Sequence, residues 1–345
     1  MSYLIIIFDN INMFADYQIH NFIKSSTGES YEVSKLKGDA SAREYYRINS
    51  GNKSYMLCID NNLKGITPEQ YAFCIVHNLL RKNGIPVPDI YSIDEKAGLL
   101  LIQDLGDSLI EQNFESMSKS ERAGLYGDLI DTVAKIQFIS GDEKTVPFSL
   151  SFDVPKLMYE FNFFIDNALI GYFKSGISGD LLEELRSEFN KISVILYKPE
   201  LFVLNHRDLH SRNIMIRDSK PYLIDFQDAR MGLPQYDVVS LLRDSYLRIE
   251  DGLVDSLKKK HFNILKARGY SRMEYDEYEY YFDIMAFQRN VKALGTFGYQ
   301  VTTLGKNLYQ RYIMPTMAYL KDYIKRRSDL SGAAGILKRF IEVDW

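Results

Sequence analysis

Cysteine is scarce in this sequence: only Cys58 and Cys74 occur in 345 residues. Cys58 lies in a strand-like apolar segment and Cys74 in a helix-like one. We therefore expect both thiols to be reduced and buried. So few cysteines exclude a disulfide-rich secreted scaffold and favour a cytoplasmic protein.

Basic tracts, long apolar runs, repeats and low-complexity linkers are also missing. The 42 Lys and Arg against 46 Asp and Glu give a net charge of -4, which argues against nucleic acid as a principal partner. The apolar run at residues 4–8 is too short to span a bilayer, and no basic segment precedes it. We therefore expect no membrane anchor. With 46% hydrophobic residues, the chain can bury one large core or two moderate ones.

The most informative motif is HRDLHSRN at residues 206–213, followed by LIDFQD at residues 223–228. Apolar residues 201–204 and 214–216 flank the first segment, and a polar turn at 217–220 separates two short strands. ATP-dependent kinases keep a catalytic base and two magnesium ligands in such a stretch. Asp208 is at the position of the base, and Asn213 and Asp225 are at those of the oxygen ligands that magnesium prefers.

Two other interpretations of the motif compete with this one. His206 and His210 are four residues apart, which on a helix would suit a zinc pair. The preceding strand and the following Ser-Arg-Asn favour a loop instead. A buried polar turn stabilised by Asp and Asn is common in ordinary folds, but it does not explain the spacing of Asp225.

The sequence divides into a small mixed half and a mainly helical half. Strands are expected within residues 35–49 and 54–60, and further short ones at 90–92 and 99–103. Between two strand candidates lie Gly38, Asp39, Ala40 and Ser41, a turn that suits either an ordinary hairpin or a phosphate-covering loop. The glycine-containing segment at 104–107 is the best boundary. It predicts an N-lobe of residues 1–104 and a C-lobe of residues 105–345.

Capping patterns predict where several helices begin. Ser118 with Glu121, and Asp180 with Glu183, are two capping boxes ahead of amphipathic segments. A third helix is expected to open at Thr67, with Pro68 in its first turn and Gln70 completing the box. The tyrosine-rich residues 275–282 offer rings for sugar stacking, but aromatic residues at helical spacing more often belong to the core.

Taken together, four segments resemble the aminoglycoside-phosphotransferase-like kinases, and among them the bacterial N-acetylmuramate/N-acetylglucosamine anomeric kinases. The carrying segments are KLKGDASAREYYRI, GIPVPDIYSIDEKAGLLLIQDLGD, LNHRDLHSRNIMIRDSKPYLIDFQDARMGLPQYDVVSLLRDSY and FQRNVKALGTFGYQ. They extend from about residue 35 to residue 300 and so cover most of the chain.

The resemblance implies an α+β, two-lobed, protein-kinase-like fold that uses ATP and Mg²⁺. It implies ATP contacts from the turn at residues 38–41 and from Gln103 and Leu105 near the boundary. His206 and Asp237 would support the catalytic loop, and for Asp237 a helix N-cap role is compatible with this. Arg243 and Asp244 would reach the acceptor, or would form a solvated charge pair.

Two departures from the protein-kinase pattern are visible. The strand after the phosphate loop contains no lysine and ends in Asp60, so Arg43, Arg47 or Lys53 would have to supply the cation for the ATP phosphates. Gln227 replaces the glycine of the Asp-Phe-Gly motif. This puts in doubt any conformational switching of the segment at residues 225–227, but not the role of Asp225.

The sequence thus predicts an ATP-dependent phosphotransferase with an alcohol acceptor, most simply the hydroxyl of an N-acetylated hexosamine. Another acceptor, such as an aminoglycoside, choline or an amino alcohol, would use the same catalytic residues. A non-catalytic ATP-binding module is the alternative from a different class. The oligomeric state and the nucleotide preference do not follow from the sequence.

Overall fold

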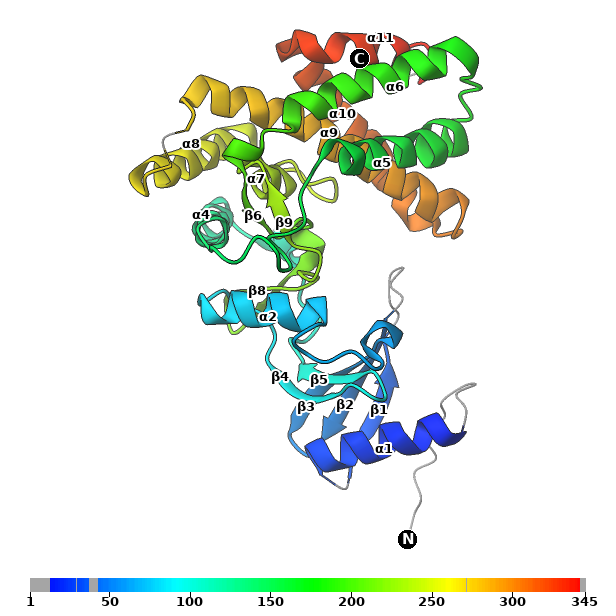
Figure 1. Ribbon diagram of the computed structural model, residues 1–345, viewed down its shortest axis with the longest axis vertical. Coiled ribbons are helices and arrows are strands. Elements are labelled where there is room, and N and C mark those ends of the chain that lie inside the picture. Colours follow the sequence, from blue (N-terminus) through cyan, green and yellow to red (C-terminus); the bar gives the residue numbers. More distant parts are fainter. Residues whose placement is uncertain (1–12, 29, 37–42, 271, 342–345) are drawn as a thin grey trace. The chain divides into compact units, whose positions relative to one another are not determined.

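The computed structural model describes residues 13–28, 30–36, 43–270 and 272–341, with side chains from residue 17 onward (Figure 1). The chain forms two compact units, one of Met1–Ser108 with Met215–Gln227 and one of Leu109–Ile214 with Asp228–Trp345. Each of the two lobes expected from the sequence, residues 1–104 and residues 105–345, is a single continuous segment of the chain. The first compact unit differs from the expected N-lobe because it also includes residues 215–227.

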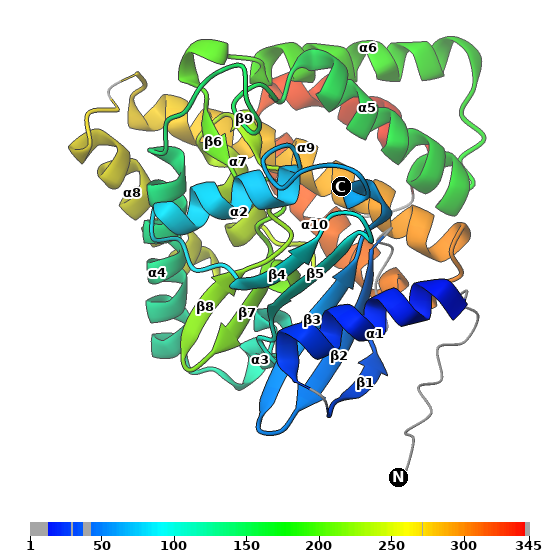
Figure 2. The same ribbon diagram turned by 60° about the horizontal axis from the view of Figure 1, so that its bottom comes forward.

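The first unit is built on a five-stranded antiparallel sheet in the order β1-β2-β3-β5-β4. Its elements are α1 (Met13–Thr27), β1 (Glu32–Lys35), β2 (Glu44–Ser50), β3 (Lys53–Ile59), α2 (Ala72–Lys82), β4 (Ile90–Asp94), β5 (Leu99–Gln103), β7 (Ile214–Arg217) and β8 (Lys220–Leu223). In Figure 2, α1 lies across one face of the sheet.

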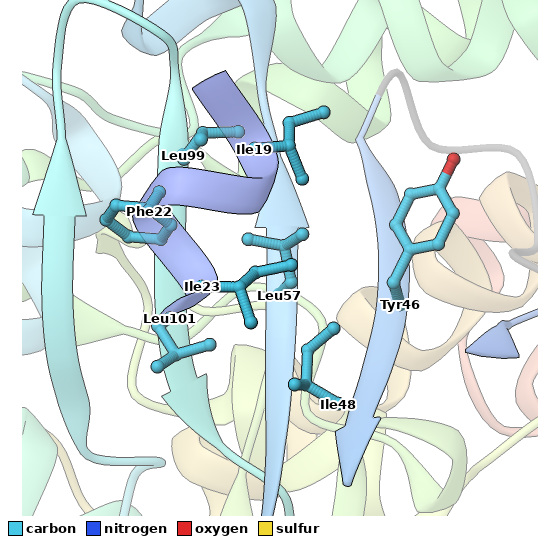
Figure 3. Close-up of a cluster of buried hydrophobic side chains, with 8 residues drawn as sticks. All are labelled: Ile19, Phe22, Ile23, Tyr46, Ile48, Leu57, Leu99 and Leu101. Atoms are coloured by element: carbon cyan, nitrogen blue, oxygen red, sulfur yellow. The ribbon is translucent and has the colours of Figure 1, made fainter. Parts of the chain in front are cut away.

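The packing of α1 follows from the apolar residues at helical spacing along it. Ile19, Phe22 and Ile23 are buried against strand residues that include Leu57 and Leu101 (Figure 3). Because α1 covers one face of the sheet, β2 alternates between more buried and more exposed positions. In contrast, β5 is buried at four of its five positions.

The β7–β8 hairpin packs within the first unit. Asp218 and Ser219 adopt positive φ angles of 50° and 60° in its turn, as tight hairpin turns require. The Leu223 amide donates to the Pro86 carbonyl at 2.8 Å. The ring of Phe226, which follows the hairpin, lies 4.9 Å from that of Phe73 on α2.

The second unit is mainly helical, and Figure 1 shows most of its helices. Its elements are α3 (Ile110–Asn113), α4 (Lys119–Gln137), α5 (Val154–Phe164), the π-helix η3 (Ile165–Tyr172), α6 (Gly179–Leu196), β6 (Val203–Asn205), β9 (Arg230–Gly232), α7 (Gln235–Leu242), α8 (Asp251–Ala267), α9 (Tyr275–Thr302), α10 (Gln310–Arg326) and α11 (Ser331–Leu337). Helix α9 packs against α5, η3, α7 and α10. The predicted α+β class is confirmed.

The capping predictions had mixed outcomes. The box of Ser118 and Glu121 is present at the start of α4. The helix after Thr67 instead begins at Ala72, because residues 67–71 form turns in which the Thr67 carbonyl accepts from the amides of Gln70 and Tyr71. Helix α6 starts earlier than predicted, with Ser178 rather than Asp180 as its N-cap residue.

Several smaller expectations can also be compared with the structure. Cys58 and Cys74 are free and buried, as predicted. Tyr278 and Phe282 are fully buried, which supports the core interpretation of the tyrosine-rich segment. None of the helices that the structure describes is long and apolar enough to cross a membrane.

Candidate active site

The HRDLHSRN segment forms an irregular loop after β6. Only its last three residues, Ser211–Asn213, make a short 3₁₀ turn, and Arg207 has a positive φ of 87°. His206 and His210 therefore do not share the helix face that a zinc pair at that spacing needs. Burial also lowers the pKa of His210 to about 3, so its ring is neutral.

Two buried carboxylates of the second unit hold the backbone of this loop. Asp237, in the first turn of α7, accepts the amides of His206 at 2.6 Å and Arg207 at 3.0 Å. Asp244, just after α7, accepts the amide of Ser211 at 2.8 Å. Burial raises the pKa of Asp237 to about 7 and that of Asp244 to about 6, although the backbone N–H groups oppose this rise. The loop is thus fixed at both ends around Asp208.

Asp208 lies among cations. Its Oδ1 is 2.7 Å from Lys292 Nζ and 3.5 Å from an Arg289 nitrogen, and its Oδ2 is 3.6 Å from Arg207 Nε. Burial by itself would raise the pKa of Asp208. The charges of Lys292, Arg207 and Arg289 outweigh it and hold the pKa well below its ordinary value. The carboxylate is therefore ionised at any physiological pH and can accept a hydrogen bond from a hydroxyl group.

Lys292 and Arg289 are site residues that the sequence analysis did not single out. Both lie on α9, inside the segment FQRNVKALGTFGYQ that contributes to the family resemblance. They are three residues apart, so they share one face of the helix. Two cations at that spacing within this segment of the resemblance are the signal that was available.

The two predicted magnesium ligands belong to different compact units. In the second unit, Asn213 Nδ2 donates to the Asp208 carbonyl at 2.9 Å, which fixes the orientation of the amide. In the first unit, Asp225 has a φ of 64° and its Oδ1 accepts from Gln227 Nε2 at 2.8 Å. A non-glycine residue in the left-handed region is uncommon and is often found at functional sites. Their joint role as ligands stays a prediction.

The predicted ATP contacts are only partly visible. The turn of Gly38, Asp39, Ala40 and Ser41 lies outside the described residues. Gln103 ends β5, where its side-chain oxygen accepts the Asp89 amide at 3.2 Å. Leu105 follows it and is buried. Their expected contact with the nucleotide stays a prediction.

The three cations considered as substitutes for the missing strand lysine differ in their surroundings. Arg43 Nε is 2.6 Å from Asp60 Oδ2 at the end of β3, and that carboxylate also accepts from the Tyr71 hydroxyl. Arg47 is turned toward Asp104, at 2.7 Å. Lys53 begins β3 and is exposed.

Arg243 and Asp244 are engaged inside the second unit. Arg243 donates to Asp251 at 2.7 Å, and its exposed fraction is 9%. Asp244, exposed by only 3%, holds Ser211 as described above. They do not form the solvated charge pair that was the alternative, since both are buried. Contact with an acceptor stays a prediction for both.

Comparison with known proteins finds one matching family model and similar curated proteins. A family model described as the phosphotransferase enzyme family matches residues 32–275. The N-acetylmuramate/N-acetylglucosamine kinase of Neisseria meningitidis serogroup B is 24% identical over 318 residues, which cover 90% of this chain and 91% of that protein. The kinase of the same name from Pseudomonas putida is 25% identical over 331 residues, 93% of each chain.

Solved structures share the fold at low sequence identity. The ADP-bound aminoglycoside phosphotransferase APH(2'')-Ib has a TM-score of 0.60 at 14% identity, over 91% of this chain and 99% of that one. Choline kinase from Cryptosporidium parvum has a TM-score of 0.59 at 11% identity, over 93% of this chain and 98% of that one. These similarities confirm the kinase-like fold predicted from the sequence.

Proposed function

The chain belongs to the phosphotransferase enzyme family, and on that premise we propose that it is an ATP-dependent sugar kinase that phosphorylates a hydroxyl of an N-acetylated hexosamine. The observation that carries the proposal is the ionised Asp208 carboxylate, held on a fixed loop by Asp237 and by the cations of α9. The choice of a sugar rests on the kinases of Neisseria and Pseudomonas, which align along nine-tenths of the chain. A cytoplasmic location would fit the use of ATP.

In this proposal Asp208 acts mainly by orientation. A carboxylate whose pKa lies far below neutrality is a weak base, so it accepts the hydroxyl proton only as the bond to phosphorus forms. Phosphoryl transfer tolerates this, because its loose transition state depends on positioning and charge stabilisation more than on early deprotonation. Fixing the loop backbone through Asp237 would therefore contribute to catalysis directly.

The remaining groups would bind the nucleotide. Asn213 and Asp225 supply oxygen donors of the kind that magnesium prefers, and the fixed amide of Asn213 fits that task. The ion would neutralise the charge on the ATP phosphates. Of the three candidate cations, we assign phosphate contact to Arg43, because Asp60 orients it and it lies two residues after the predicted phosphate loop.

The proposal predicts turnover that depends on Asp208. Purified protein with magnesium-ATP should phosphorylate N-acetylmuramate or N-acetylglucosamine, and phosphorus NMR of the product locates the new ester. Because general-base and orienting groups are typically worth ~10²–10⁴-fold, Asp208→Asn should lower kcat by that order. Asp218→Asn, in the exposed turn of the β7–β8 hairpin, is the matched control and should leave kcat unchanged.

The same experiment separates the alternatives. A folded Asp208→Asn enzyme with near-normal turnover would show that another residue serves as the base. Phosphorylation of choline, an amino alcohol or an aminoglycoside, but not of either sugar, would show that the proposed acceptor is wrong and that the proposed phosphoryl transfer is right. ATP binding without transfer to any member of such a panel would support a non-catalytic binding module.

A further inference from the structure

Two further cations of the second unit lie near the catalytic loop and α9, outside the ion pairs that Asp208 forms. Arg230 pairs across the strands with Asn205, the residue before His206, and Lys156 is 3.6 Å from Glu160, which accepts from Gln288 of α9. Lys156 is in the first turn of α5, and Arg230 is the first residue of β9. The two segments are adjacent, because Ser151 forms a bridge with Met231 and the Phe152 amide donates to the Met231 carbonyl at 3.0 Å. The Arg230 guanidinium also lies over the Phe152 ring.

The cations nearest Asp208 already have close partners. Lys292 contacts Asp208 at 2.7 Å, Arg207 contacts Asp228 at 2.5 Å, and Arg289 donates to the Tyr236 hydroxyl at 2.7 Å. These three side chains are thus committed to the organisation of the catalytic loop and α9.

Lys156 and Arg230 are much less compensated by the part of the chain that the structure describes. The carboxylate nearest Lys156 Nζ is that of Glu160 at 3.6 Å, which is beyond hydrogen-bonding range. Gln288 donates to the same Glu160 carboxylate at 2.8 Å. The Nε of Arg230 donates to the Asp228 backbone carbonyl at 3.2 Å, and no described acceptor bonds its terminal nitrogens.

The electrostatics of both cations are unfavourable in the protein alone. Burial is the main cause that lowers the pKa of Lys156; the charge of Glu160 and, more weakly, that of Asp208 oppose it, while the charges of Arg207 and Arg230 act in the same direction as burial, and the pKa stays below its ordinary value. Burial and the Arg207 charge lower the pKa of Arg230 as well. Desolvated, mutually repelling cations are stabilised by a bound anion.

We propose that Lys156 and Arg230 form an anion subsite that binds a carboxylate of the acceptor while its hydroxyl lies against Asp208. The inference rests on the proposed function and narrows its acceptor class to sugar acids. N-acetylmuramate carries a carboxylate and N-acetylglucosamine does not, so the subsite discriminates between the two. The same charges disfavour cationic acceptors such as choline and aminoglycosides, because like charges in a binding site repel.

A phosphate oxygen of ATP is the other anion that two such cations would attract. An acceptor carboxylate and an ATP phosphate can be distinguished by which kinetic quantity changes when the charge of Lys156 is removed. An acceptor subsite makes the preference between the two sugars depend on it. A nucleotide subsite makes the KM for ATP depend on it, equally with either sugar.

The test compares wild type, Lys156→Met, Lys156→Arg and the control Lys191→Met, which removes an exposed lysine on α6. For each protein, kcat/KM is measured with both sugars and KM with ATP, and calorimetry measures binding of each sugar without nucleotide. A charge-assisted hydrogen bond is worth about ten- to a hundredfold in affinity. Lys156→Met should lower the preference for N-acetylmuramate by that factor. Lys156→Arg should retain most of it, and Lys191→Met all of it.

Each result decides between the two claims. Equal losses for both sugars in Lys156→Met, or a raised KM for ATP with an unchanged preference, would overturn the acceptor subsite. If the wild type phosphorylates neither sugar, yet binds N-acetylmuramate more tightly than N-acetylglucosamine through Lys156, the proposed function fails and the subsite stands. If the wild type binds neither sugar, both are wrong.

Discussion

At the scale of single residues, the pairing of Asp208 with Lys292 is the feature that most affects the chemistry. The two residues are 84 positions apart in sequence, yet their charged atoms are 2.7 Å apart. Burial would raise the pKa of an isolated carboxyl at this position, and Lys292 is the strongest influence in the opposite direction. Lys292 therefore keeps Asp208 ionised inside a largely desolvated site.

This pairing predicts a change in the pH profile when the cation is removed. Activity that needs ionised Asp208 is lost as the pH falls through its pKa, which in the wild type lies below the ordinary value. In Lys292→Met the burial effect is less opposed, so the pKa rises and the acid limb of log kcat/KM should move to higher pH. The profile is measured at saturating magnesium-ATP.

The charge-conserving variant Lys292→Arg is the control for the pH experiment. It should keep the acid limb near its wild-type position even if its kcat falls through altered geometry. An acid limb that is the same in Lys292→Met and wild type would mean that Asp208 does not set it.

At the scale of secondary-structure elements, helix α9 is positioned by close contact with α5 and η3. A Cβ on Gly298 would lie 2.4 Å from the Asn167 carbonyl oxygen, and one on Gly295 would lie 2.8 Å from the Phe164 Cα. Backbone atoms cannot move aside as a flexible side chain can. The two glycines therefore allow the close approach that also places Arg289 and Lys292 beside Asp208.

Gly298→Ala should accordingly be destabilising and should also impair catalysis. Overpacking of a well-packed site costs about 1–3 kcal/mol, and a displaced α9 would weaken the contact of Lys292 with Asp208. Thermal or urea unfolding measures the first effect, and kcat the second. Gly252→Ala in α8, where a Cβ meets no atom within 4 Å, should be neutral or slightly stabilising. Equal stability of the two variants would refute the close-packing argument.

At the scale of the whole molecule, the features that could be predicted from the sequence are those that depend on residues close together in the chain. The kinase-like motif, the hairpin at residues 214–223 and the capping box of α4 each lie within one short continuous stretch, the longest being residues 206–228. Lys292 was missed because its partner is distant in sequence and because lysines on helices are usually solvated. The helix start at Thr67 was predicted wrongly because a capping pattern cannot reveal that the next residues form turns instead.

The extent of the first compact unit also depends on contacts between residues that are far apart in sequence. A boundary at residues 104–107 follows from local composition, but the contacts assign residues 215–227 to the first unit as well. Several interactions contribute to this: the Ile216 amide donates to the Ser108 carbonyl, the Leu223 amide donates to the Pro86 carbonyl, Arg217 donates to the Asp104 carbonyl, and the Phe226 ring packs on α2. The hairpin is therefore part of the first unit's core, and that core is incomplete in a fragment that stops at the boundary.

A comparison of two fragments tests this division of the chain. Residues 1–108 alone should unfold with low cooperativity, while the same fragment joined by a flexible linker to residues 213–228 should be more stable. Burial of a phenylalanine side chain contributes about 1.5–3 kcal/mol, and Phe226 is only 1% exposed. Phe226→Ala in the linked fragment should therefore remove most of the gain, as measured by urea unfolding and by hydrogen exchange of α2. Equal stability of the fragments with and without the hairpin would show that the first unit folds from residues 1–108 alone.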